Sequence, residues 1–194
     1  MPNNLTAFNE HNPKDGIYAT IPKATVNKYQ NKLPKALIDI WEKEGLSSYK
    51  DGFFWLVNPD EYKEIIYQFI PNEDTLHVLI RTAFGGLIYL NEQAKKQKNN
   101  SQEKYNYLCP IYLQVTPLTS DFTALMNGWL TTEDIYIPLM LYEVFRTAKK
   151  RLPSLQSDQC FGFTPAIALG GDITPNNISV FNIKEHLGFL SQLK

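Results

Sequence analysis

The stretch TLHVLIRTAFGGLIYL, residues 75–90, decides the fold class. Two apolar runs flank Gly85 and Gly86. Apolar runs of this length form strands, and glycine adopts the positive φ that a tight turn demands. The stretch therefore predicts a hairpin of two antiparallel strands.

The residues before this hairpin predict helices that alternate with strands. LPKALIDIWEKEG, residues 33–45, has apolar residues at helical spacing, with Pro34 in the first turn and Gly45 as the stop. GLSSYKDGFFWLVNP, residues 45–59, predicts strand structure around an Asp-Gly hairpin turn. PDEYKEIIYQFI, residues 59–70, predicts a second helix that an Asn-Pro pair opens.

The residues after the hairpin begin with a polar tract, NEQAKKQKNNSQEK, at residues 91–104. A tract without large apolar residues predicts a loop or a linker. YNYLCPIYLQV, residues 105–115, then predicts one aromatic strand, and SDFTALMNGWL, residues 120–130, predicts a short helix.

One longer helix is expected next. Thr131 or Thr132 would cap its start, because threonine followed by acidic residues is typical of a helix N-terminus. Pro138 lies in the early part of this helix and predicts a kink. Pro153 forbids continuation, so the helix should end within residues 149–152.

The last part of the sequence contains a second glycine pair, Gly170 and Gly171, after the apolar run FGFTPAIA. Neither glycine pair has the G-x-G-x-x-G or G-K-[ST] spacing of a phosphate loop, so both predict hairpin turns. A strand, ISVFNI, and a terminal helix, IKEHLGFLSQL, follow. Together these elements predict an α+β fold, with a mixed or antiparallel sheet and flanking helices.

Composition bounds the function classes. The chain has 194 residues, of which 43% are apolar, enough for a sizeable core. Nineteen basic and twenty acidic residues give a net charge of -1, which argues against non-specific nucleic-acid binding. The N-terminus has no signal-peptide pattern, and no apolar run approaches the about 20 residues that span a bilayer, so we expect a cytoplasmic protein without membrane contact.

No residue pattern argues for catalysis, a metal or a cofactor. His11, His77 and His186 lie in three different elements, and His186 is expected to be a packing or capping residue. Cys160 resembles a buried core thiol, although a disulfide with Cys109 stays open. The sequence therefore predicts no catalytic residue, no metal ligand and no bound cofactor.

Acidic residues dominate one segment. Residues 105–145 contain four acids, Asp121, Glu133, Asp134 and Glu143, and no lysine or arginine. An acidic surface steers a basic partner and raises its association rate, whereas the alternative is a solvated face without a partner. Asp172, directly after the second glycine pair, is a further candidate of the same kind.

Four pieces of sequence carry a resemblance to known families: DGFFWLVNP, RTAFG, FGFTPAIALGG and KEHL. In order and spacing, residues 21–193 resemble a GAD-like domain followed by the C-terminal domain of the Tdi immunity proteins of type VI secretion systems. Two departures stand out. Gly86 replaces the acidic or polar residue expected after TAFG, and the tract at residues 91–104 is looser than expected.

The resemblance implies a GAD-like domain at residues 1–100 and a Tdi-type immunity domain at residues 101–194, packed together as one compact unit. It also implies a distant likeness to the SMI1/KNR4 (SUKH) fold. The implied function is that of an immunity protein, which binds and blocks a cognate toxin, in the named family a DNase effector. The family has no catalytic motif, which agrees with the absence of one in this sequence.

An acidic patch fits a nuclease partner, because it can occupy the surface that holds phosphate. The toxin-binding candidates are therefore Asp121, Glu133, Asp134 and Asp172. Two alternatives stay open: an enzyme with a site between the two halves, and a non-catalytic tRNA-binding module, which the name of the GAD domain suggests. The sequence predicts no particular oligomeric state.

Overall fold

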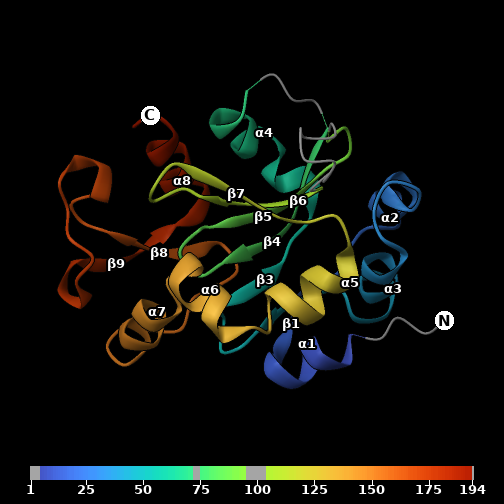
Figure 1. Cartoon of the computed structure of the whole chain (residues 1–194), viewed down its shortest axis with the longest axis horizontal. Coiled ribbons are helices and arrows are strands. Elements are labelled where there is room, and N and C mark those ends of the chain that lie inside the picture. Colours follow the sequence, from blue (N-terminus) through green and yellow to red (C-terminus); the bar gives the residue numbers. More distant parts are fainter. Residues whose placement is uncertain (1–4, 72–74, 95–103, 194) are drawn as a thin grey trace.

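The computed structural model describes residues 5–71, 75–94 and 104–193, with a seven-stranded antiparallel sheet at its centre (Figure 1). The strands lie in chain order, and each pairs with the next. They are β1 Lys14–Ala19, β2 Leu46–Tyr49, β3 Phe54–Leu56, β4 Leu76–Thr82, β5 Leu87–Asn91, β6 Tyr105–Cys109 and β7 Gln114–Thr119. The predicted α+β class with an antiparallel sheet is confirmed, and the SMI1/KNR4 likeness stays a prediction.

Helices flank this sheet, and a small two-stranded sheet lies beside it (Figure 1). The α-helices are α1 Thr6–His11, α2 Lys23–Tyr29, α3 Lys35–Glu44, α4 Pro59–Phe69, α5 Phe122–Ala124, α6 Glu133–Met140, α7 Tyr142–Lys149 and α8 Ile183–Ser191. Three other helical turns are η1 Leu125–Trp129, η2 Ile167–Leu169 and η3 Pro175–Asn177, and the small sheet pairs β8 Gln159–Phe163 with β9 Ile178–Asn182. Among the described helices, none has the length and apolar character to cross a membrane.

The hairpin predicted from residues 75–90 is confirmed as β4 and β5. Its two glycines have different roles. Gly85 has a φ of +74°, which the turn requires, whereas Gly86 is the glycine on which the ring of Tyr107 packs. A Cβ at Gly86 would overlap the Tyr107 side chain, so this glycine serves close packing between β5 and β6 rather than the turn.

The helices predicted on either side of β2 and β3 are confirmed as α3 and α4. Gly45 ends α3 with a φ of +66°, a value that favours glycine. Asn58 caps α4, because its side-chain oxygen accepts a hydrogen bond of 3.1 Å from the Asp60 N–H. These caps fix where each helix meets its neighbouring strand.

Two predicted elements are each divided by a residue in the left-handed region. The single strand expected at residues 105–115 is a hairpin, β6 and β7, with Leu113 at a φ of +52° in its turn. The single kinked helix expected after Thr132 is two helices, α6 and α7, which meet at Leu141 with a φ of +62°. Leu141 is buried, so packing holds a backbone conformation that leucine does not prefer by itself.

The connection between β8 and β9 also differs from the prediction. The strands pair, but no tight glycine turn joins them, because residues 164–177 form a longer loop with η2 and η3 in it. Gly170 ends η2 with a φ of +83°. Gly171 lies so close to the carbonyl oxygen of Pro165 that a Cβ would overlap it. The second glycine pair therefore shapes a long loop and does not make a hairpin turn.

The small sheet is joined to the large one at the end of β4. The Phe161 N–H donates to the carbonyl oxygen of Ala83 at 2.8 Å. The Phe84 ring packs on Phe161 and Phe163, with ring centroids 5.8 and 5.4 Å apart. The expected domain boundary at residue 100 falls between β5 and β6, and these two strands pair with each other. Residue 100 itself lies in the stretch 95–103, which is outside the described residues. The two-domain division stays a prediction.

A candidate protein-binding surface

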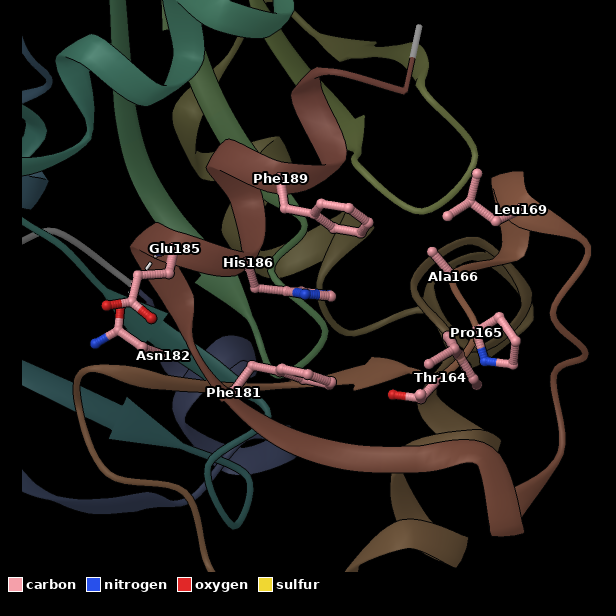
Figure 2. A pocket seen from close by; sticks show the side chains of 10 residues that line it. Thr164, Pro165, Ala166, Leu169, Phe181, Asn182, Glu185, His186 and Phe189 are labelled. Atoms are coloured by element: carbon pink, nitrogen blue, oxygen red, sulfur yellow. Dashed lines mark hydrogen bonds between the residues drawn. The ribbon is translucent and has the colours of Figure 1, made fainter.

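A pocket of about 390 Å³ opens between α8 and the 164–177 loop (Figure 2). Aromatic rings form one wall, and proline and aliphatic side chains form the other: Phe181, His186 and Phe189 face Pro165, Ala166 and Leu169. Pockets of this volume, lined mainly by apolar groups, are typical of binding sites.

The aromatic wall is positioned by the junction of β9 with α8. Asn182 ends β9 and caps α8, because its side-chain oxygen accepts hydrogen bonds from the N–H groups of Lys184 and Glu185 at 3.1 and 3.3 Å. His186 and Phe189 are three residues apart, so they lie on one face of α8, above Phe181 of the strand. The Glu185 carboxylate points toward Asn182, away from the facing wall (Figure 2).

His186 is a neutral packing residue at the base of this pocket. The residue is 7% exposed, and its ring stacks on that of Phe181, with the ring centroids 4.5 Å apart and an angle of 12° between the ring planes. Burial lowers the pKa of His186 to about 4, so the ring is uncharged at neutral pH. Gly162 lies directly against the ring, and a Cβ there would overlap it. The packing role expected for His186 from the sequence agrees with this geometry.

Two of the apolar side chains that line the pocket are exposed. Leu169 is 59% exposed and Phe189 is 44% exposed, and Ile173, farther along the same loop, is 37% exposed. Gathered apolar exposure of this kind marks interaction surfaces, whereas single exposed residues do not. These three residues give no distinct signal in the sequence, because apolar residues beside glycines or on a terminal helix predict core packing equally well.

The four acids predicted to bind a toxin lie on three separate elements. Asp121 caps α5 by accepting a 2.7 Å hydrogen bond from the Ala124 N–H. Glu133 and Asp134 are in the first turn of α6. Asp172 lies in the 164–177 loop, three residues after Leu169 of the pocket lining. Their role in binding stays a prediction, and only Asp172 shares an element with the pocket.

Two cations bond to side chains of the acidic segment. Lys50, in the turn after β2, donates a 2.8 Å hydrogen bond to the Tyr136 hydroxyl, which in turn donates to Glu133 at 3.3 Å. Arg146 pairs with Glu143 at 3.1 Å. The link from Lys50 through Tyr136 to Glu133 could not be predicted from the sequence, because residues 50 and 133 are far apart along the chain. The field of this segment is therefore weaker than its composition predicts.

Neither cysteine is part of a disulfide or a metal site. Cys109 and Cys160 are both buried free thiols. Burial raises the pKa of Cys160 to about 12, which keeps the thiol protonated and unreactive. Within the part of the chain that the structure describes, no three His, Cys, Asp or Glu side chains gather in a way that could hold a metal ion.

Arg81 is a buried cation that the sequence analysis did not single out. It lies next to the C-terminal end of β4, is fully buried, and its guanidinium carbon lies 4.2 Å from the centre of the Trp55 ring. One guanidinium nitrogen donates a 3.1 Å hydrogen bond to the carbonyl oxygen of Ser157, just before β8. Burial lowers the pKa of Arg81. In the sequence, the only sign of this role is an arginine within a mainly apolar strand. Its contacts indicate that Arg81 helps to hold the small sheet against the large one.

Comparisons with known proteins found two family models along the chain. Residues 4–101 match the GAD-like domain, and residues 127–194 match the T6SS immunity protein Tdi1, C-terminal. No curated protein matches the chain. The fold is similar to that in the crystal structure of Atu4351 from Agrobacterium tumefaciens, with 18% identity, a TM-score of 0.78, and coverage of 96% of this chain and 88% of that one.

The second match and the pocket occupy the same part of the chain. Every residue that lines the pocket, from Phe163 to Phe189, lies within residues 127–194. The match to an immunity domain supports an immunity role for the region in which the exposed apolar surface lies.

Proposed function

Because the chain belongs to the GAD-like domain family, and its C-terminal part matches the Tdi1 immunity domain, we propose that it neutralises a cognate type VI secretion toxin by binding it. The toxin is a DNase, as the resemblance implies, and the complex forms in the cytoplasm. The observation that carries the proposal is the apolar pocket with an exposed apolar rim inside the matched immunity region.

The chemistry of this surface suits a stoichiometric inhibitor. Protein interfaces draw most of their binding energy from bulky side chains seated in apolar pockets at the centre of the contact. The pocket supplies such a seat, and Phe189 and Leu169 supply apolar contact area at its mouth. The lowered pKa of His186 makes its ring a weak base, and the raised pKa of Cys160 keeps its thiol protonated, so neither side chain is poised to act as a base or nucleophile.

Asp172 is the acid best placed to contribute to toxin binding. It lies on the pocket loop, whereas Asp121, Glu133 and Asp134 lie on α5 and α6. An acid at the rim of an apolar contact steers a basic nuclease without the cost of burying a charge. We therefore assign the steering role to Asp172 ahead of the other three.

The test is binding and protection with the toxin encoded next to this gene. We expect Leu169→Asp and Phe189→Asp each to weaken the complex by about tenfold or more, because a buried carboxylate replaces an apolar anchor. Calorimetric titration measures affinity, and survival of cells that co-express the toxin measures protection. Ile17→Asp is the matched control, since Ile17 is 58% exposed but lies on β1. Equal affinity for all four proteins would refute this surface.

One feature favours the nucleic-acid alternative. Lys28, Lys32 and Lys63 line a small pocket of about 120 Å³ between α2 and α4, although Lys28 is already paired with Asp60. With a net charge of -1, we expect this cluster to be too small to hold a polyanion. Filter binding of tRNA and DNA at physiological salt measures this, and retention of tRNA at micromolar protein would favour the alternative.

A further inference from the structure

The hydrogen-bond register of the small sheet shows which backbone groups of β9 point outward. Antiparallel pairs alternate between residues that bond to each other and residues whose N–H and C=O groups point away from the partner strand. At one end of the ladder the Ile183 N–H donates a hydrogen bond to the Asp158 carbonyl oxygen, and at the other end the Thr164 N–H donates to the Asn177 carbonyl oxygen. These two bonds fix the alternation along the strands between them. Val180, opposite Phe161, is therefore a residue whose N–H and C=O point away from β8.

The outward groups of the two strands have different surroundings. On β8, the outward N–H of Phe161 is bonded to Ala83 of the large sheet. On β9, Arg151 donates to the outward carbonyl of Ile178 at 2.9 Å. For the N–H and C=O of Val180, the described residues supply no hydrogen-bond partner. The edge of β9 is thus open at Val180, and Val180 is next to Phe181 of the pocket wall.

The outer strands of the large sheet carry features that discourage pairing with another chain. β1 has Lys14 and Asp15 and two irregularities in its register, and β7 has Pro117. Charges, bulges and proline are the usual means by which proteins block an edge. β9, with the sequence ISVFN, has no charged residue and no proline, and its register with β8 is unbroken. The contrast indicates an edge that is kept available.

From these observations we infer that an extended segment of the toxin adds a strand to β9 at Val180 and seats a bulky apolar side chain in the adjacent pocket. This inference rests on the proposed function and names the form in which the partner binds. A residue hydrogen-bonded to Val180 has sequence neighbours whose side chains lie on the face of Phe181, and that face opens into the pocket. Main-chain bonds provide affinity, and the pocket provides selectivity.

A second copy of this chain could not both pair with the edge of β9 and fill the pocket. If two copies paired through β9, the residues of the second β9 on the pocket side would be Ser179 and Phe181. Ser179 is too small to fill an apolar pocket, and Phe181 is packed on its own His186. The pocket would stay empty in such a dimer, so a different protein is the better occupant.

The test separates the main chain of Val180 from its side chain. Val180→Pro removes the outward N–H, which the fold does not use, and an edge strand tolerates proline at such a position. Val180→Thr keeps the N–H with a side chain of nearly the same shape. By calorimetric titration with the toxin, we expect Val180→Pro to weaken binding by about tenfold or more and Val180→Thr to change it by less than about threefold. Thermal unfolding checks that both variants are folded.

Hydrogen exchange on the unmodified protein gives a second measurement that does not depend on a variant. In the complex, we expect the Val180 amide to exchange at least about tenfold more slowly than in the free protein. Unchanged exchange overturns the inference, as does equal affinity of Val180→Pro and wild type, while in both cases the immunity function stands. A toxin-free dimer that Val180→Pro dissociates also overturns it. If the wild type binds no toxin at all, the proposed function itself fails.

Discussion

At the scale of single residues, burial determines the charge of His186. Its pKa is lowered to about 4, whereas the ordinary value is 6.5. Between these two pH values the unfolded chain binds a proton that the folded protein does not, so stability rises with pH across this window. The stabilising contribution is complete above about pH 6.5 and is lost as the pH falls toward 4.

We therefore predict that part of the loss of stability at acid pH is caused by protonation of His186. Between about pH 7 and pH 4, the free energy of unfolding of the wild type should fall by about 3 kcal/mol more than that of His186→Gln, which has no titrating ring. Urea unfolding at several pH values measures both curves, and the carboxylates common to both proteins cancel in the difference. Parallel curves would show that His186 titrates with an ordinary pKa.

At the scale of elements, the 164–177 loop depends on one close backbone approach. A Cβ at Gly171 would overlap the carbonyl oxygen of Pro165. We expect Gly171→Ala to lower the free energy of unfolding by about 1–3 kcal/mol, because the loop must shift to accept a methyl group. The same shift moves Leu169, so the variant should also bind toxin less tightly. Thermal unfolding and calorimetric titration measure these two effects.

Gly128 provides the matched control for this prediction. It lies in η1, outside the loop, and a Cβ there would have nothing within 4 Å. Gly128→Ala should leave toxin affinity unchanged and should keep or slightly raise stability, because alanine restricts the unfolded chain. If the two variants behave alike, the close approach at Gly171 is not what shapes the loop.

The elements themselves were predictable where local signals agreed with each other. The stops and caps at Gly45 and Asn58 are set by neighbouring backbone, so sequence alone located α3 and α4. The divisions at Leu113 and Leu141 were not predictable, because leucine gives no local signal for positive φ and the packing that holds it comes from elsewhere. Arg81 gave only a partial signal, since its contacts with Trp55 and Ser157 are made through the tertiary fold.

The candidate site was less predictable than the fold. Sequence reasoning directed attention to acids, because charge can be counted along a chain. The pocket instead brings together residues from β8, β9, α8 and a loop, and its openness depends on which apolar side chains stay exposed. Exposure is a property of the folded surface, so Leu169 and Phe189 could be recognised only in the structure.

At the scale of the whole molecule, the large sheet extends beyond the first family match, because β6 and β7 lie between the two matched regions and β6 pairs with β5. We expect thermal unfolding to be a single cooperative transition, with equal calorimetric and van't Hoff enthalpies, because separating the two matched regions would break the hydrogen bond of Phe161 to Ala83 and the contacts of Phe84 with Phe161 and Phe163. Differential scanning calorimetry measures both enthalpies. Two resolved transitions would mean that the regions unfold independently.

The chain-order pairing of the seven strands has a consequence for synthesis. Each ladder of the large sheet joins neighbours in sequence, so contact order is low there, and strands can assemble as the chain leaves the ribosome. The pocket is built from residues 163–189, which emerge after that sheet. A nascent chain that stalls before α8 would therefore carry most of the fold without the pocket. If the pocket is the toxin-binding surface proposed above, such a chain would give no protection.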